Sequence, residues 1–193
     1  MYKNNYEKFI KNDLIFGQKY ENWFGDTFLP QYIQNDDNQY DLKTDTNTYE
    51  IKTDSQCFIY YRFGFEVNSY KKLSGIWTTT ADYWVCLTPI MNRIIIMKVD
   101  DIKQFIKEHK HNSIMRKTGD DKASKMVLWD WNYFMDNMEN KEVINNIIPI
   151  LYNIEAKVVL FNKLKKYIDS EECNERRNYR VINNHYEKLI KRI

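Results

Sequence analysis

The chain has 193 residues, of which 43% are hydrophobic and 29% charged, and its formal net charge is +2. This length suits one domain with a substantial core, and no run approaches the roughly 18 consecutive apolar residues that a membrane span needs. The three cysteines are scattered without a CxxC pair, which argues against a disulfide framework and a zinc site. The net charge neither indicates nor excludes nucleic-acid binding, because phosphate affinity depends on a clustered basic patch.

The first residues, MYKNNYEKFIKND, lack the apolar run and the small-residue cleavage site of a secretory signal. We therefore expect a cytoplasmic protein, located in the cytoplasm of the host cell if a phage encodes it. We expect no membrane partner.

The N-terminal region has the periodicity of an amphipathic helix. Its large apolar residues recur at three- and four-residue spacings from residue 2 to residue 29. Asn12 and Asp13 have the chemistry of an internal helix cap, so we expect two helical segments, the second of which ends at Pro30.

Strand-forming runs dominate the middle of the chain. The predicted strands are, in chain order, 39–44, 48–53, 57–67, 81–87, 93–99 and 125–131. The runs 81–87 and 93–99 are almost continuously apolar, which predicts central strands buried on both faces. Gly64 indicates a bulge or a close approach of another backbone.

Helical patterns return in the second half of the chain. The segment 99–111 predicts a helix capped by Asp100 or Asp101. From about residue 133 onward an apolar stripe that includes Ile144, Ile147, Ile148 and Leu151 predicts helix, split by Pro149. We therefore expect an α/β or α+β core over 1–132 and a helical C-terminal extension over 133–193 that packs on it.

The predicted hairpin formed by 39–44 and 48–53 gathers charge on one face. Because side chains alternate along a strand, Glu50 and Lys52 share a face. If the turn is centred between Asp45 and Thr46, the numbers of opposite residues sum to 91, which places Asp41 across from Glu50 with Cβ atoms about 5 Å apart.

Two carboxylates this close raise one another's pKa unless a cation lies between them, and Mg²⁺ binds such a pair together with water. Lys52 could then hold a metal-bound water or take its proton. A solvated hairpin with cross-strand charges remains an alternative, because short motifs recur by chance. The other candidates for the first carboxylate are Asp36, Asp37, Asp45 and Asp54.

Asp41 followed by Glu50-Ile51-Lys52 resembles the signature of the PD-(D/E)XK nuclease superfamily, an Asp at one strand end and (D/E)-x-K on the next strand. The resemblance to small phage-type members extends over roughly residues 38–88. The further matching positions are Glu66, Ser74-Gly75-Ile76, Thr79, Thr80 and Ala81-Asp82-Tyr83-Trp84. One departure is Tyr40, which stands where many members have a proline.

This resemblance implies a restriction-endonuclease-like α/β core, with a mixed central β-sheet flanked by helices and with C-terminal helices added. It implies an Mg²⁺- or Mn²⁺-dependent DNA endonuclease in which Asp41, Glu50 and the carbonyl of Ile51 bind the metal. Lys52 would orient or activate the attacking water. Glu21 matches the acidic residue that many members place on the first helix to reach the metal.

The phage-type resemblance suggests an enzyme that acts on branched DNA from recombination or repair, such as a Holliday junction, or a restriction-like endonuclease. An enzyme that resolves such junctions would act as a homodimer, because two symmetric cuts need two sites. Asp82 and Tyr83 begin a predicted buried strand, and we favour a structural role for both, with positioning of the hairpin from behind as the alternative. The alternative function is a catalytically silent DNA-binding or interaction protein on a nuclease-like fold.

Overall fold

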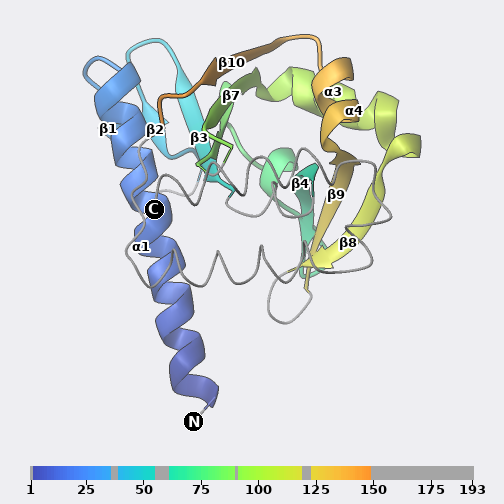
Figure 1. Cartoon of the computed structure of the whole chain (residues 1–193), viewed down its shortest axis with the longest axis horizontal. Coiled ribbons are helices and arrows are strands. Elements are labelled where there is room, and N and C mark those ends of the chain that lie inside the picture. Colours follow the sequence, from blue (N-terminus) through green and yellow to red (C-terminus); the bar gives the residue numbers. More distant parts are fainter. Residues whose placement is uncertain (1, 36–38, 55–60, 90, 119–122, 149–193) are drawn as a thin grey trace.

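The computed structural model describes residues 2–35, 39–54, 61–89, 91–118 and 123–148, with side chains considered from residue 15 onward. Within these ranges the chain forms two β-sheets, three α-helices and two short 3₁₀ helices (Figure 1). None of the helices in this part of the chain combines the length and the apolar character that crossing a membrane requires.

The first half of the described chain contains the long helix, five strands and one 3₁₀ helix. Its elements are α1 (Tyr2–Phe28), β1 (Ile33–Gln34), β2 (Leu42–Lys43), β3 (Thr48–Thr53), β4 (Arg62–Ser69), β5 (Lys72–Leu73) and η1 (Gly75–Trp77). The remaining elements are β6 (Tyr83–Thr88), β7 (Arg93–Lys98), α3 (Val99–His109), η2 (Lys110–Asn112), β8 (Ile114–Thr118), β9 (Ser124–Asp130), α4 (Trp131–Asn137) and β10 (Lys141–Asn145).

The larger sheet has the strand order β1-β2-β3-β6-β7-β10. It is mixed, because β3 and β6 are parallel whereas the other neighbours are antiparallel. The second sheet is antiparallel, with the order β5-β4-β9-β8. The prediction of an α/β fold with a mixed central sheet flanked by helices is confirmed at this level, and the separation of β4 and β9 into a second sheet was not predicted.

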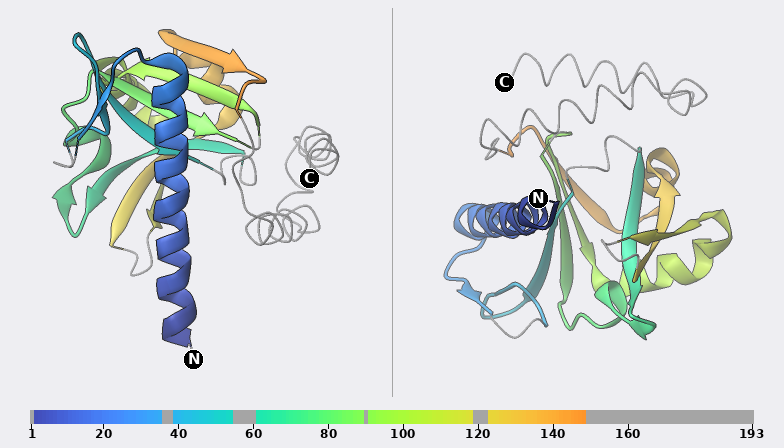
Figure 2. Two further views of the ribbon diagram at one scale, coloured as in Figure 1. Left: turned by 90° about the vertical axis from the view of Figure 1, so that its left-hand side faces the viewer. Right: turned by 90° about the horizontal axis from the view of Figure 1, so that it is seen from below.

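The larger sheet lies between α1 on one side and the second sheet with α3 on the other (Figure 2). An apolar cluster packs against each of its faces. On one face α1 packs Tyr20 and Phe24 against Ile51 and Val85 of the sheet. On the other face the second sheet, α3 and α4 form the larger cluster. Strands β6 and β7 lie inside the sheet with mostly buried side chains, which confirms the prediction that they are central.

Helix α1 is continuous, so the prediction of two segments divided at Asn12 and Asp13 is wrong. Each of these residues disfavours a helix interior by well under 1 kcal/mol, which is too little to break the helix without a proline or glycine beside it. The helix ends just before Pro30, as predicted, and its N-terminal part extends beyond the sheets (Figure 1).

The predicted helix around Ile144 is also wrong, because β10 occupies residues 141 to 145 and pairs with β7. Val143 lies opposite Ile95 and Ile144 opposite Ile94, so apolar residues that suit a helix stripe instead extend the sheet. The core sheet therefore includes residues beyond 132. The rest of the predicted extension, from residue 149 to 193, lies outside the described residues.

Three local predictions have different outcomes. A Cβ atom on Gly64 would lie 2.8 Å from the Val127 carbonyl oxygen, so the predicted close approach of another backbone is confirmed, while the bulge lies between Glu66 and Asn68. Lys98, rather than Asp100 or Asp101, is the N-cap of α3. Strand β8 had no counterpart among the predicted strands, and residues 57–60 of the predicted third strand lie outside the described residues.

Candidate active site

The hairpin of β2 and β3 has the predicted register. Leu42 lies opposite Tyr49 and Lys43 opposite Thr48, so the numbers of each pair sum to 91. The amide of Asp41 donates a hydrogen bond of 2.8 Å to the carbonyl of Tyr49, a pair whose numbers sum to 90 rather than 91. The ladder therefore does not extend to the predicted pairing of Asp41 with Glu50, and it is the contacts of the Asp41 carboxylate with Ile51 and Lys52 that place it beside β3.

Asp41, Glu50 and Lys52 form a compact charged group on this hairpin. The Nζ atom of Lys52 lies 2.5 Å from Oε1 of Glu50 and 3.6 Å from Oδ2 of Asp41. The same Asp41 oxygen accepts a 2.6 Å hydrogen bond from the amide of Ile51, which fixes the carboxylate against β3. The Ile51 side chain points the other way, into the cluster beneath α1.

The carbonyl of Ile51 in β3 points away from β6, toward the side on which Asp41 lies. Thr48 and Asp54 form backbone hydrogen bonds with the β6 segment, whereas the carbonyl of Tyr49 accepts from Asp41. Because the N–H and C=O of one residue in a strand point to the same side, even-numbered residues face β6 and Ile51 faces Asp41. Its carbonyl oxygen is thus available beside the two carboxylates.

Residues 78 to 83 support the hairpin from behind. Oδ2 of Asp82 accepts hydrogen bonds of 2.8 Å from both the amide and the hydroxyl of Thr48. The ring of Tyr83 stacks on Tyr49 with the centroids 5.5 Å apart. Asp82 and Tyr83 therefore join the start of β6 to the hairpin, in a structural role.

The Ser74-Gly75-Ile76 segment is anchored to Glu66. The hydroxyl of Ser74 donates a 2.7 Å hydrogen bond to the Glu66 carboxylate. Gly75 has φ +54° and lies so close to Glu66 that an added Cβ would be 2.5 Å from its carbonyl oxygen. Ile76 is fully buried. This part of the sequence pattern therefore fixes the backbone that leads to Thr79 and Asp82.

Glu21 of α1 is electrostatically coupled to the charged group. Its pKa is raised from 4.5 to about 7, first by burial, then by the Asp41 carboxylate and to a smaller extent by Glu50, while Lys52 opposes the rise. The half-buried Glu21 carboxyl has no hydrogen bond or ion pair with a described residue. It thus adds, close to the hairpin, an acidic group that no described basic side chain pairs with.

The acidic groups outnumber the basic ones at this point of the fold. Burial raises the pKa of the Glu50 carboxyl, an effect that the Lys52 ammonium opposes and the Asp41 carboxylate increases. Burial would lower the pKa of Lys52, but the carboxylates of Asp41 and Glu50 outweigh it and raise that pKa. The single ammonium of Lys52 interacts with the carboxylates of both Asp41 and Glu50, and a further cation would stabilise their ionised forms.

Asp41, Glu50 and the Ile51 carbonyl offer oxygen atoms only, the ligand type that Mg²⁺ and Mn²⁺ prefer. Among the described residues, no group of three or more Asp, Glu, His or Cys side chains is close enough to hold a metal ion. Mg²⁺ commonly uses one or two carboxylates and completes its shell with water and substrate phosphates. The donor set therefore fits such an ion in chemistry and charge.

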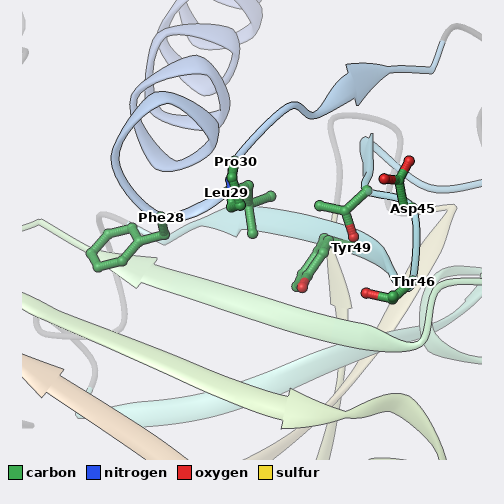
Figure 3. Close-up of a pocket in the computed structure, with 7 residues that line it drawn as sticks. Phe28, Leu29, Pro30, Asp45, Thr46 and Tyr49 are labelled. Atoms are coloured by element: carbon green, nitrogen blue, oxygen red, sulfur yellow. The ribbon is translucent and has the colours of Figure 1, made fainter.

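The other acidic candidates lie elsewhere. Asp45 is an exposed turn residue beside a hollow of about 320 Å³ between the end of α1 and the hairpin turn (Figure 3). Asp54 follows the end of β3, and its amide bonds to the carbonyl of Leu87. Asp36 and Asp37 lie outside the described residues.

Two contacts of the site were not predicted, although the sequence pattern includes both Thr79 and Trp84. The Thr79 hydroxyl lies 3.2 Å from Oε2 of Glu50, the oxygen that does not contact Lys52. The ammonium of Lys52 also lies 5.8 Å from the centroid of the Trp84 ring, within cation–π range. Sequence spacing could not find these contacts, because both partners come from a segment about 30 residues away that the fold brings beside β3.

A scan against models of protein families finds no match for this chain. Searches of curated proteins and of solved structures find none either. A function for this site must therefore be argued from its geometry and from the sequence pattern.

Proposed function

We propose that the chain is a DNA endonuclease of the PD-(D/E)XK type, which uses Mg²⁺ or Mn²⁺ to hydrolyse phosphodiester bonds on a restriction-endonuclease-like core. The observation that carries the proposal is the meeting of Asp41, Glu50 and Lys52, in which the Lys52 ammonium is 3.6 and 2.5 Å from the two carboxylates. The resemblance over residues 38–88 supports it independently, because it includes positions outside the hairpin.

In this proposal Asp41, Glu50 and the carbonyl of Ile51 hold the metal ion. When bound, the ion supplies a Lewis acid for the phosphate and lowers the pKa of a coordinated water. Lys52 lies on the same face as both carboxylates, so its ammonium can orient or activate the attacking water and contact a phosphate oxygen. Glu21, with a pKa of about 7, can hold or release a proton beside the site near neutral pH.

The crowding of acidic groups favours an enzyme over a silent binding protein. In a protein that only binds DNA, lysine and arginine side chains strengthen binding because they neutralise the phosphates. Carboxylates at the same place repel the DNA backbone. Carboxylates beside a phosphate are useful when a divalent ion lies between them. The excess of acid over base around Lys52 is thus the expected arrangement for a metal-dependent nuclease.

The test is a cleavage panel with duplex, flap, four-way junction and single-stranded DNA, each incubated with Mg²⁺, Mn²⁺ or EDTA. We expect metal-dependent cleavage of at least one substrate. Symmetric cutting of the junction would extend the proposal to a homodimer, because each cut needs its own site.

Asp41→Ala and Glu50→Ala should abolish this cleavage. Asp45→Ala is the matched control, since Asp45 is an exposed acidic residue of the same hairpin, and it should retain the activity. Cleavage that persists in both site variants would show that the active site lies elsewhere. A wild-type protein that binds DNA but cleaves none of the substrates with either metal would favour the silent DNA-binding alternative.

A further inference from the structure

The hydroxyl of Thr79 is a buried polar group at the back of the candidate site. Thr79 is 9% exposed. Its Oγ1 atom lies 3.2 Å from Oε2 of Glu50 and 3.1 Å from the carbonyl oxygen of Gln39, and it accepts a hydrogen bond of 3.2 Å from the amide of Ala81. One hydroxyl thus contacts Glu50, the segment that leads to Asp41, and its own loop.

A hydroxyl has one hydrogen to donate, so Thr79 cannot donate fully to Glu50 and Gln39 at once. The Gln39 carbonyl already accepts a hydrogen bond of 3.2 Å from the amide of Thr80. The amide of Ala81 occupies a lone pair of the Thr79 oxygen. Of the two acceptors in reach of the Thr79 hydrogen, the Glu50 carboxylate is the stronger because it is an anion, which favours donation to Glu50.

The backbone around Thr79 is held on both sides. The amide of Thr79 donates a 3.1 Å hydrogen bond to the carbonyl of Gly75. Gly75 in turn lies against the backbone of Glu66 in a left-handed conformation that other residues rarely adopt. The hydroxyl is thus presented to Glu50 from a segment with little freedom to move, which is the condition for one side chain to orient another.

We propose that Thr79 is a positioning residue of the metal site: its hydroxyl holds Oε2 of Glu50, so that Oε1 faces Lys52 and Asp41. This inference rests on the proposed function and goes beyond it, because it gives separate roles to the two threonines of the sequence pattern. Thr79 contacts Glu50 and the Gln39 carbonyl, whereas Thr80 is exposed and donates from both its amide and its hydroxyl to the Gln39 carbonyl.

The test compares Thr79→Val, which removes the hydroxyl and keeps the shape, with Thr79→Ser, which keeps the hydroxyl. Thr80→Val is the matched control in the neighbouring position. Mn²⁺ affinity is measured by calorimetric titration without DNA, and cleavage is measured separately. We expect Thr79→Val to bind Mn²⁺ about 10-fold or more weakly, as for other residues that orient a metal ligand. Thr79→Ser and Thr80→Val should stay close to the wild type.

A crystal structure of the metal-free Thr79→Val protein gives a readout that does not depend on activity. We expect the Glu50 carboxylate to leave its position beside residue 79 in this variant and to keep it in Thr80→Val. Thr79→Val also leaves the amide of Ala81 without its acceptor. Thermal unfolding is therefore recorded for each variant, and Thr79→Ala, which leaves room for water at that amide, replaces the valine variant if the latter does not fold.

The outcomes separate this inference from the proposed function. If the wild type binds Mn²⁺ and cleaves DNA, and folded Thr79→Val does both equally well, Thr79 has no positioning role and the nuclease proposal stands. Equal losses in Thr79→Val and Thr80→Val would also overturn the role, since they would reflect a general change in the segment. If the wild type neither binds Mn²⁺ nor cleaves, both proposals fall.

Discussion

Replacing Glu21 with glutamine removes a negative charge that is unfavourable in the folded protein. Glutamine keeps the size and shape of the side chain and resembles the protonated carboxyl. Because burial and Asp41 raise the pKa of Glu21, the ionised form is less stable in the folded chain than in the unfolded chain. We predict that Glu21→Gln stabilises the metal-free protein at pH 8.

The size and the pH range follow from the pKa. A rise from 4.5 to about 7 corresponds to roughly 3 kcal/mol for a fully shielded carboxylate, at about 1.4 kcal/mol per pH unit. Glu21 is only half-buried, so solvent screening reduces the expected gain to about 1 to 2 kcal/mol. Between pH 4.5 and 7 the folded wild type binds more protons than the unfolded chain, so its stability falls as pH rises. The advantage of the variant should grow through this window and level off above it.

The assay is urea unfolding of wild type and Glu21→Gln at several pH values from 4.5 to 8, in EDTA. The control is Glu139→Gln, which changes an exposed glutamate outside the site and should follow the wild type at every pH. Parallel stability curves for wild type and Glu21→Gln would refute the coupling of Glu21 to the site.

Four further substitutions, one of them a comparison for Gly75, test the supporting contacts, each by urea unfolding in EDTA. Lys52→Met removes the ammonium between two carboxylates and should destabilise the protein by about 1 to 2 kcal/mol. The loss is smaller than for a fully buried pair because the lysine side chain is 47% exposed. An unchanged urea midpoint would contradict the ion pairs. Gly75→Ala should cost about 2 to 4 kcal/mol, because φ is +54° and the added Cβ would meet backbone at 2.5 Å. Gly17→Ala lies in the helix, where an added Cβ would be 3.7 Å from Oε1 of Glu21, an ordinary van der Waals contact, and should instead add up to about 1 kcal/mol. Equal effects of the two changes would be inconsistent with the backbone geometry. Asp82→Ala breaks both hydrogen bonds to Thr48 and should cost about 1 to 3 kcal/mol, whereas a neutral result would show that the hairpin does not depend on them.

The hairpin was predictable because its information is local. A turn of fixed length determines the register, and the register determines which side chains face each other. The sequence of the hairpin therefore predicts that Asp41, Glu50 and Lys52 lie together. The apolar runs of β6 and β7 were equally clear, because strands buried on both faces need no polar alternation.

The remaining features depend on partners far away in the sequence. Thr79 reaches Glu50 because β6 pairs in parallel with β3, and the sequence near residue 79 does not indicate that pairing. Val143 and Ile144 fit a helix stripe as well as a strand until β7 is present to pair with them. The electrostatic coupling of Glu21 to the hairpin likewise depends on the packing of α1 on the sheet.

The most direct test of the account is the Mg²⁺-dependent cleavage rate of the Lys52→Ala protein, measured on the best substrate of the panel. The matched control is Lys43→Ala, which removes an exposed lysine from the same hairpin. The account predicts that Lys52→Ala is about 100-fold slower than the wild type or worse, while Lys43→Ala cleaves at close to the wild-type rate. Cleavage by Lys52→Ala at the wild-type rate would contradict the account.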